Sequence, residues 1–133
     1  LCICTQQALA QMKEHNEESH IIHIGSMSGH RVPLGANGVY CATKFAVRAL
    51  TESLRQEMQA AKRVVRVTTI SPGLVETGFA SNYAGSADAA EKTYGALKCL
   101  QSEDVASAVL YTLAQPDHVQ IHDILLRPKE QGS

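Results

Sequence analysis

The sequence lacks three things: an excess of charge of one sign, a long apolar run and a regular cysteine pattern. Its 133 residues carry a formal net charge of -1, so no positive field would attract nucleic acid or an anionic membrane surface. Its apolar runs are far shorter than the about 20 residues that span a bilayer. We therefore expect neither a nucleic-acid partner nor a membrane partner. A hydrophobic content of 44% is still enough to build a packed core.

Cysteine is sparse and irregularly placed. The four cysteines contain no pair of Cys-x-x-Cys steps, and their spacing fits neither a zinc site nor a disulfide framework. We expect free thiols, which are typical of a reducing compartment, and hence a cytoplasmic location. The six histidines are spaced like ordinary surface or core residues, so we assign no metal ligand. No signal peptide is visible, but the chain starts at Leu1 within an apparent helix, and we expect preceding residues to be missing.

The order of the expected elements is that of an α/β protein. Apolar runs, the clearest of them β-branched, predict strands at 21–24, 64–70 and 119–126. The helical period predicts helices at 1–15, 40–61, 87–97 and 103–115, the last capped by Ser102 and stopped by Pro116. A strand, a crossover helix and a strand over residues 21–70 predict a parallel βαβ unit. The fold class is therefore a doubly wound parallel sheet.

Two residues at the start of the second expected helix have complementary chemistry. Tyr40 and Lys44 are four residues apart, and a helix has about 3.6 residues per turn, so both lie on one face. An ammonium group beside a phenol favours the phenolate, which prepares the tyrosine to exchange a proton. On this spacing alone, a half-buried aromatic residue next to a surface lysine is the alternative interpretation.

Two further segments are expected at the same end of the sheet. Residues 25–28 follow the first expected strand, and the segment 71–73 follows the second. Ligands of doubly wound sheets bind beyond the carboxyl ends of the strands, so both segments should converge with Tyr40. A serine that donates to a carbonyl oxygen and a tyrosine that exchanges its proton suit carbonyl reduction or alcohol oxidation. The hydride must come from a cofactor, because no side chain donates one.

Four motifs resemble those of one known family. YCATK at 40–44 resembles its Tyr-x-Ala-Ser/Thr-Lys motif, and SMSG at 26–29 resembles its Ser-x-x-Gly motif. SPGLVET at 71–77 is similar to its Pro-Gly-x-Val-x-Thr segment, and SEDVA at 102–106 is similar to its Pro-Glu-Asp-Val-Ala element. The whole chain thus resembles the C-terminal half of a classical short-chain dehydrogenase/reductase. Three strands and three to four helices of a Rossmann-type doubly wound sheet are implied.

The resemblance implies a role for each matching residue. Tyr40 would be the acid/base, Lys44 would favour its phenolate and bond the nicotinamide ribose, and Ser26 would polarise the substrate oxygen. The nicotinamide would lie against a set of cofactor-binding residues, Pro72, Gly73, Val75 and Thr77, together with Tyr40 and Lys44. The variable segment 79–100 would cover the substrate, with Phe79, Tyr83 and Tyr94 as candidate contacts.

Residues 28–33 and 127–131 look most like one branch of the family, which holds the insect farnesol dehydrogenase-like proteins and the vertebrate dehydrogenase/reductase member eleven. That branch implies NADP as the cofactor, with NAD as the alternative. It also implies a small-molecule substrate, which would be a carbonyl or alcohol of a steroid, an isoprenoid or a small carbonyl compound. The full-length protein would be a homodimer or homotetramer.

Several alternatives stay open. Ser26 lies one residue further from Tyr40 than is usual in the family, so Ser28 is an alternative to Ser26. The family's glycine-rich phosphate-binding turn would precede Leu1, so residues 1–133 would be an incomplete NAD(P)-binding domain, inactive and aggregation-prone alone. Other functions that fit Tyr-x-x-x-Lys are a nucleotide-sugar epimerase or dehydratase. A truncated chain that acts only as a non-catalytic dimerisation partner is the third alternative.

Overall fold

Three parallel strands form the centre of the molecule. The computed structural model describes residues 1–15, 18–84, 94, 95 and 97–132. In the sheet, β2 (Val65–Pro72) lies between β1 (Ser19–Ile24) and β3 (Asp123–Leu126). Ile24 of β1 and Ile124 of β3 both pair with Ile70 of β2, so the carboxyl ends of all three strands lie at one edge. The predicted doubly wound parallel sheet is confirmed.

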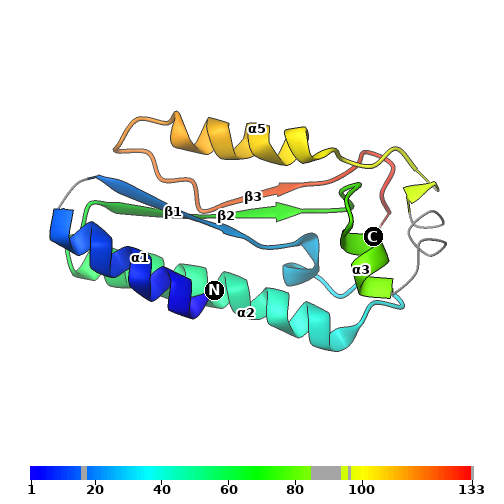
Figure 1. Ribbon diagram of the computed structural model, residues 1–133, viewed down its shortest axis with the longest axis horizontal. Helices are drawn as coiled ribbons and strands as arrows, with labels where there is room; N and C mark the ends of the chain where they lie inside the picture. Colours follow the sequence, from blue (N-terminus) through cyan, green and yellow to red (C-terminus); the bar gives the residue numbers. More distant parts are fainter. Residues whose placement is uncertain (16–17, 85–93, 96, 133) are drawn as a thin grey trace.

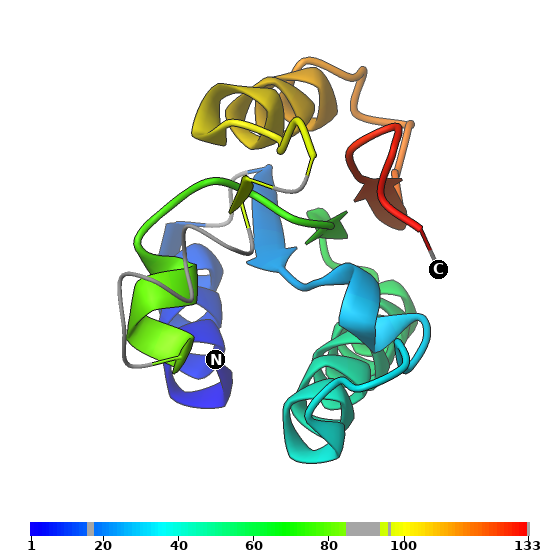
Figure 2. The same ribbon diagram turned by 90° about the vertical axis from the view of Figure 1, so that its right-hand side faces the viewer.

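Helices cover both faces of this sheet (Figure 1). Helices α1 (Cys2–His15) and α2 (Gly38–Ala60) lie on one face, and α5 (Ser102–Leu113) lies on the other. Figure 2 shows the same three layers end-on. Leu9 and Met12 of α1 and Met58 of α2 pack against one core cluster, which contains Ile21, Leu54, Val65 and Val67. The short helix α3 (Phe79–Ala84) and the 3-10 helix η1 (Met27–Gly29) lie at the carboxyl ends of the strands.

Strand β2 is buried on both faces because it is central and covered by helices on each side. Val67, Thr68 and Ile70 have no exposed surface, which explains its nearly continuous β-branched sequence. Full burial of one such aliphatic side chain contributes about 1.5–3 kcal/mol. Strand β1 is at an outer edge of the described sheet, and its last residue, Ile24, is 52% exposed.

The ends of two helices differ from the sequence prediction. Helix α2 begins at Gly38 rather than Tyr40, because the Asn37 side chain accepts hydrogen bonds from the backbone N–H groups of Val39 and Tyr40. The predicted cap of the last helix, Ser102, is wrong: Ser102 is the first helical residue and Gln101 is the N-cap. The Asp104 carboxylate accepts from the Gln101 backbone N–H over 2.8 Å, which stabilises this start.

The last strand and one helix also need comment against the sequence prediction. The last strand is confined to Asp123–Leu126, because the chain before it forms a turn in which Val119 N donates to Pro116 O over 2.8 Å. The helix expected at 87–97 falls mostly on residues outside the described part of the chain.

Candidate active site

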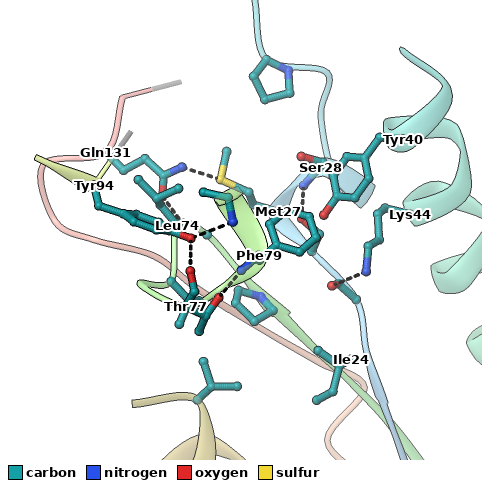
Figure 3. A pocket seen from close by; sticks show the side chains of 18 of the residues that line it. Ile24, Met27, Ser28, Tyr40, Lys44, Leu74, Thr77, Phe79, Tyr94 and Gln131 are labelled. Atoms are coloured by element: carbon teal, nitrogen blue, oxygen red, sulfur yellow. Dashed lines mark hydrogen bonds between the residues drawn. The ribbon is translucent and has the colours of Figure 1, made fainter. Parts of the chain in front are cut away.

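A cavity of about 640 Å³ lies beyond the carboxyl ends of β1 and β2 (Figure 3). It is lined by all seven residues that the sequence analysis selected, which are Ser26, Tyr40, Lys44, Pro72, Gly73, Val75 and Thr77. The alternative serine, Ser28, lines it as well. The residues selected from the sequence come from three segments that are distant in sequence: η1 with its flanks, the start of α2, and the chain that leaves β2.

Lys44 is fixed in place by the strand end. Its Nζ donates a hydrogen bond to the carbonyl oxygen of Gly25 over 3.1 Å and lies 5.7 Å from the centre of the Tyr40 ring. Partial burial lowers the pKa of the Lys44 ammonium from its ordinary value. An ammonium has three N–H donors, so a bond to Gly25 leaves two for groups inside the cavity. Figure 3 shows Tyr40 and Lys44 side by side along one face of α2.

The two serines lie in the 3-10 turn that follows β1. The Ser26 side chain caps this turn, and its Oγ accepts from the backbone N–H of Ser28 over 3.1 Å. This bond orients Ser26 while its own hydroxyl proton is still able to donate. Gly29 ends the turn against α2, and a Cβ at this position would lie 2.6 Å from the carbonyl oxygen of Lys44. The absent side chain thus lets the serine turn approach the helix that carries Tyr40 and Lys44.

The chain that leaves β2 presents backbone groups to the cavity. Glu76 N donates to Leu100 O over 2.9 Å, and Leu100 N donates to Leu74 O over 3.0 Å. In such a bridge the N–H and C=O of the residue between, Val75, point away from Leu100. Val75 lines the cavity, and its backbone donor and acceptor are not used by the bridge to Leu100.

Aromatic side chains form a further wall of the cavity, beside Tyr40. Phe79 of α3 lies with its ring centre 6.0 Å from that of Tyr40. The Tyr94 hydroxyl donates to Thr77 O over 2.9 Å and accepts from Ala80 N over 3.1 Å, which fixes the start of α3. Phe79 and Tyr94 both line the cavity, as the sequence suggested, whereas the Tyr83 side chain is outside the described set. This wall suits an apolar ligand.

The sequence did not indicate several residues of the cavity wall, and Gln131 is the one among them whose side-chain amide is hydrogen-bonded there. Gln131, in the polar segment after β3, lines the cavity and accepts a hydrogen bond from the backbone N–H of Leu74 over 3.0 Å. A single glutamine in a polar segment is not a motif, so no sequence signal indicates this position.

Neither a metal centre nor a membrane span is evident in the described part of the chain. No group of three or more His, Cys, Asp or Glu side chains there is arranged to hold a metal ion. Among the described helices, none combines the length and the apolar character that a membrane crossing requires.

One cavity of this doubly wound sheet thus brings together the tyrosine, the lysine, the serine turn and the Pro-Gly segment on which the family resemblance rests. The sequence model of the short chain dehydrogenase family matches residues 1–88, and the chain belongs to this family. Its fold is the Rossmann-type fold of that family. The family resemblance drawn from the four motifs is thereby confirmed.

Individual relatives identify the branch. Human dehydrogenase/reductase SDR family member 11 is 54% identical over 134 residues, which cover 98% of this chain and 52% of that protein. Farnesol dehydrogenase of Aedes aegypti is 37% identical over 129 residues, which cover 96% of this chain and 49% of that protein. Both belong to the branch that residues 28–33 and 127–131 predicted. The chain spans about half the length of the curated relatives it matches.

A solved structure agrees with this assignment. The closed form of a serine dehydrogenase complexed with NADP+ superimposes with a TM-score of 0.88 at 40% identity, covering 97% of this chain and 51% of that one. A serine dehydrogenase from Escherichia coli gives a TM-score of 0.73 at 34% identity, over 97% of this chain and 48% of that one.

Proposed function

We propose that the protein carrying this chain is an NADP-dependent oxidoreductase that interconverts a carbonyl compound and an alcohol. The observation that supports this function is the meeting of Tyr40, Lys44 and Ser26 with the segment 72–77 around one cavity of about 640 Å³. This volume is in the range of small-molecule sites, which is about 300–1,000 Å³.

The residues present fit the nicotinamide end of the cofactor. The Val75 backbone offers a donor and an acceptor to the carboxamide, with Pro72, Gly73 and Thr77 beside it. The Lys44 ammonium, held by Gly25, would bond the ribose hydroxyls. When bound, the cofactor supplies or accepts the hydride. The choice of NADP over NAD is supported by the similarity to a serine dehydrogenase that was solved with NADP+.

Tyr40 is the acid/base in this proposal. During reduction the Tyr40 hydroxyl gives its proton to the substrate oxygen, and during oxidation the phenolate takes that proton back. The positive charge of Lys44 on the same helix face stabilises the phenolate. Ser26 donates a hydrogen bond to the same substrate oxygen, and the Ser28 backbone N–H holds Ser26 for this task.

The substrate is an apolar or partly apolar molecule with a single reacting carbonyl or hydroxyl. The wall formed by Met27, Leu74, Phe79 and Val105 supports a steroid, an isoprenoid or a small carbonyl compound. The similarity to an insect farnesol dehydrogenase is consistent with the isoprenoid class.

The remaining part of the proposal concerns the whole protein. Residues 1–133 form an incomplete NAD(P)-binding domain, and the dinucleotide-binding half lies N-terminal to β1, which is an edge strand with an exposed Ile24. Exposed apolar side chains on α2 and α5, including Phe45 and Leu110, support a homodimer or homotetramer. All four cysteines are free thiols, which supports a cytoplasmic location.

The experiment is a reductase assay of the full-length protein. NADPH and NADH are each offered with a panel of apolar ketones, aldehydes and isoprenoid aldehydes, and the absorbance of the reduced nicotinamide is followed. Oxidation of NADPH that depends on the carbonyl compound is expected, with slower oxidation of NADH. Binding of NADPH without turnover on any carbonyl or alcohol would instead favour a non-catalytic partner role.

A further inference from the structure

Gln131 brings a polar group to the wall that faces the substrate. The wall around it is made by apolar side chains, and Met27 and Leu74 are its direct neighbours (Figure 3). A carboxamide at such a place binds either the protein or a ligand, because an unpaired polar group in an apolar wall is costly. Both ends of the carboxamide have a protein neighbour, so the strength of each hydrogen bond decides which end is available to a ligand.

The hydrogen bonds determine the orientation of this carboxamide. The backbone N–H of Leu74 is a donor, so the Gln131 atom that meets it at 3.0 Å must be the oxygen, Oε1. The amide nitrogen, Nε2, then faces Met27 and lies 2.9 Å from its sulfur. A thioether sulfur is a weak acceptor, and an oxygen atom of a ligand would replace it with a gain in hydrogen-bond strength.

The segment that carries Gln131 is packed closely against the chain that leaves β2. Gly73 N donates to Leu126 O over 2.7 Å, and a Cβ on Gly73 would clash with Gln131 Oε1 and with Arg127. Gln131 N donates to Pro128 O over 3.1 Å, which closes a turn. From the serine side, Arg31 donates to the carbonyl oxygen of Gly132 over 3.2 Å. Gln131 is therefore held between the serine turn and the segment after β2.

We propose that Gln131 is a specificity-determining residue, whose Nε2 donates to a second oxygen atom of the substrate, separate from the reacting oxygen. The proposal rests on the proposed oxidoreductase function. Ser26 and Tyr40 bind the reacting oxygen, and Gln131 binds a hydroxyl or carbonyl oxygen further along the molecule. The favoured substrates are therefore hydroxycarbonyl or dicarbonyl compounds rather than the corresponding simple ketones.

The test uses the full-length protein with Gln131→Glu and Gln131→Met. Glutamate keeps an oxygen acceptor for Leu74 N and removes the N–H donor, whereas methionine keeps the length and removes both. The probes are a linear aliphatic ketone and the hydroxyketones that carry one extra hydroxyl along the same chain. Turnover with each probe and the Kd of NADPH are measured for every variant. The matched control is Gln7→Met, an exposed glutamine on α1.

A substrate contact by Gln131 should change the ratio of kcat/KM for a hydroxyketone to kcat/KM for the parent ketone. Wild-type protein should prefer at least one hydroxyketone over the parent ketone in kcat/KM. In both Gln131 variants this ratio should fall by about three- to tenfold, because one hydrogen bond to an uncharged group is lost. In Gln131→Glu, kcat/KM for the parent ketone and the Kd of NADPH should change little.

Two other outcomes separate the inference from the function. An unchanged preference in both variants, with kcat/KM lowered equally for all probes, would show that Gln131 only anchors its segment and would overturn the inference. Absence of turnover in wild-type protein with these probes and with the whole panel of carbonyl compounds above would overturn the proposed function itself.

Discussion

The Nζ atom of Lys44 donates to the carbonyl oxygen of Gly25 over 3.1 Å, which ties the helix that carries Tyr40 to the end of β1. Strand and helix thus hold the ammonium from two sides, while its ring contact with Tyr40 spans 5.7 Å. Because Gly25 directly precedes Ser26, the same bond also sets the distance between the serine turn and the helix. Lys44 therefore has a structural contact and an electrostatic one in the same side chain.

Replacement of Lys44 should impair both cofactor binding and turnover. Lys44→Met keeps the apolar stem and removes the charge and the bond to Gly25. We expect kcat/KM to fall by up to about 10²–10⁴, the usual contribution of the acid-base step that Lys44 assists through Tyr40, together with weaker binding of NADPH. Steady-state kinetics and fluorescence titration with NADPH measure these two effects. Lys13→Met, on the exposed side of α1, is the control and should leave both values unchanged.

Mutation should distinguish the roles of Ser26 and Ser28. Ser26 Oγ is oriented by the backbone N–H of Ser28, so the Ser28 side chain is not needed for that bond. Ser26→Ala should lower kcat by about 10²–10³, as the loss of an oxyanion donor does, and Ser28→Ala should lower it far less. The kcat values of the two variants on one carbonyl substrate are compared. A larger loss in Ser28→Ala would assign the role to Ser28.

Gly29 should tolerate no side chain. A Cβ there would lie 2.6 Å from the Lys44 carbonyl oxygen, so Gly29→Ala must push the serine turn away from α2. We expect a loss of about 1–3 kcal/mol in the free energy of unfolding, as for other overpacked sites, and a lower kcat. Urea denaturation measures the first effect. Gly38→Ala is the matched control, since a Cβ there meets nothing within 4 Å; equal effects of both substitutions would contradict the close approach.

The stability of the fold should fall in mild acid because of a buried histidine. His23 is 7% exposed, and its Nδ1 donates to Thr51 Oγ1 over 2.8 Å, since Thr51 gives its own proton to Val47 O. In the neutral ring Nε2 then accepts from the Thr5 hydroxyl over 3.1 Å. Burial lowers the pKa of His23, and burial likewise lowers the pKa of His20.

The sign of this pH dependence follows from the lowered pKa. The unfolded chain binds a proton more tightly than the folded one, so the stabilisation is present above the ordinary pKa of about 6.5 and is lost below it. Each histidine contributes a slope of up to about 1.4 kcal/mol per pH unit. Urea denaturation between neutral and mildly acidic pH should show a smaller slope for His23→Gln. The exposed His15→Gln should keep the wild-type slope; a wild-type slope in His23→Gln would contradict the assignment.

The sequence predicted the parts of the site that depend on local spacing. Tyr40 and Lys44 were placed on one face by the helical period, and the segment 71–73 by its position after a β-branched run. Val75 and Thr77 followed from the resemblance to the Pro-Gly-x-Val-x-Thr segment. The predicted helix starts were less accurate. The caps at Asn37 and Gln101 are recognised by their hydrogen bonds in the folded chain, and nothing in the neighbouring sequence marks these two residues as caps. The position of Gln131 in the cavity could not be predicted from the sequence. Its partner Leu74 is 57 residues away, and only the folded chain brings the two together.

The proposed function depends most directly on the acid/base role of Tyr40. Tyr40→Phe in the full-length protein removes one oxygen atom and keeps the aromatic ring that contacts Phe79. The measurement is kcat on the best carbonyl substrate together with the Kd of NADPH. Turnover should fall by at least about 10²-fold, and the Kd should be unchanged. Turnover by Tyr40→Phe at the wild-type rate would contradict this role of Tyr40.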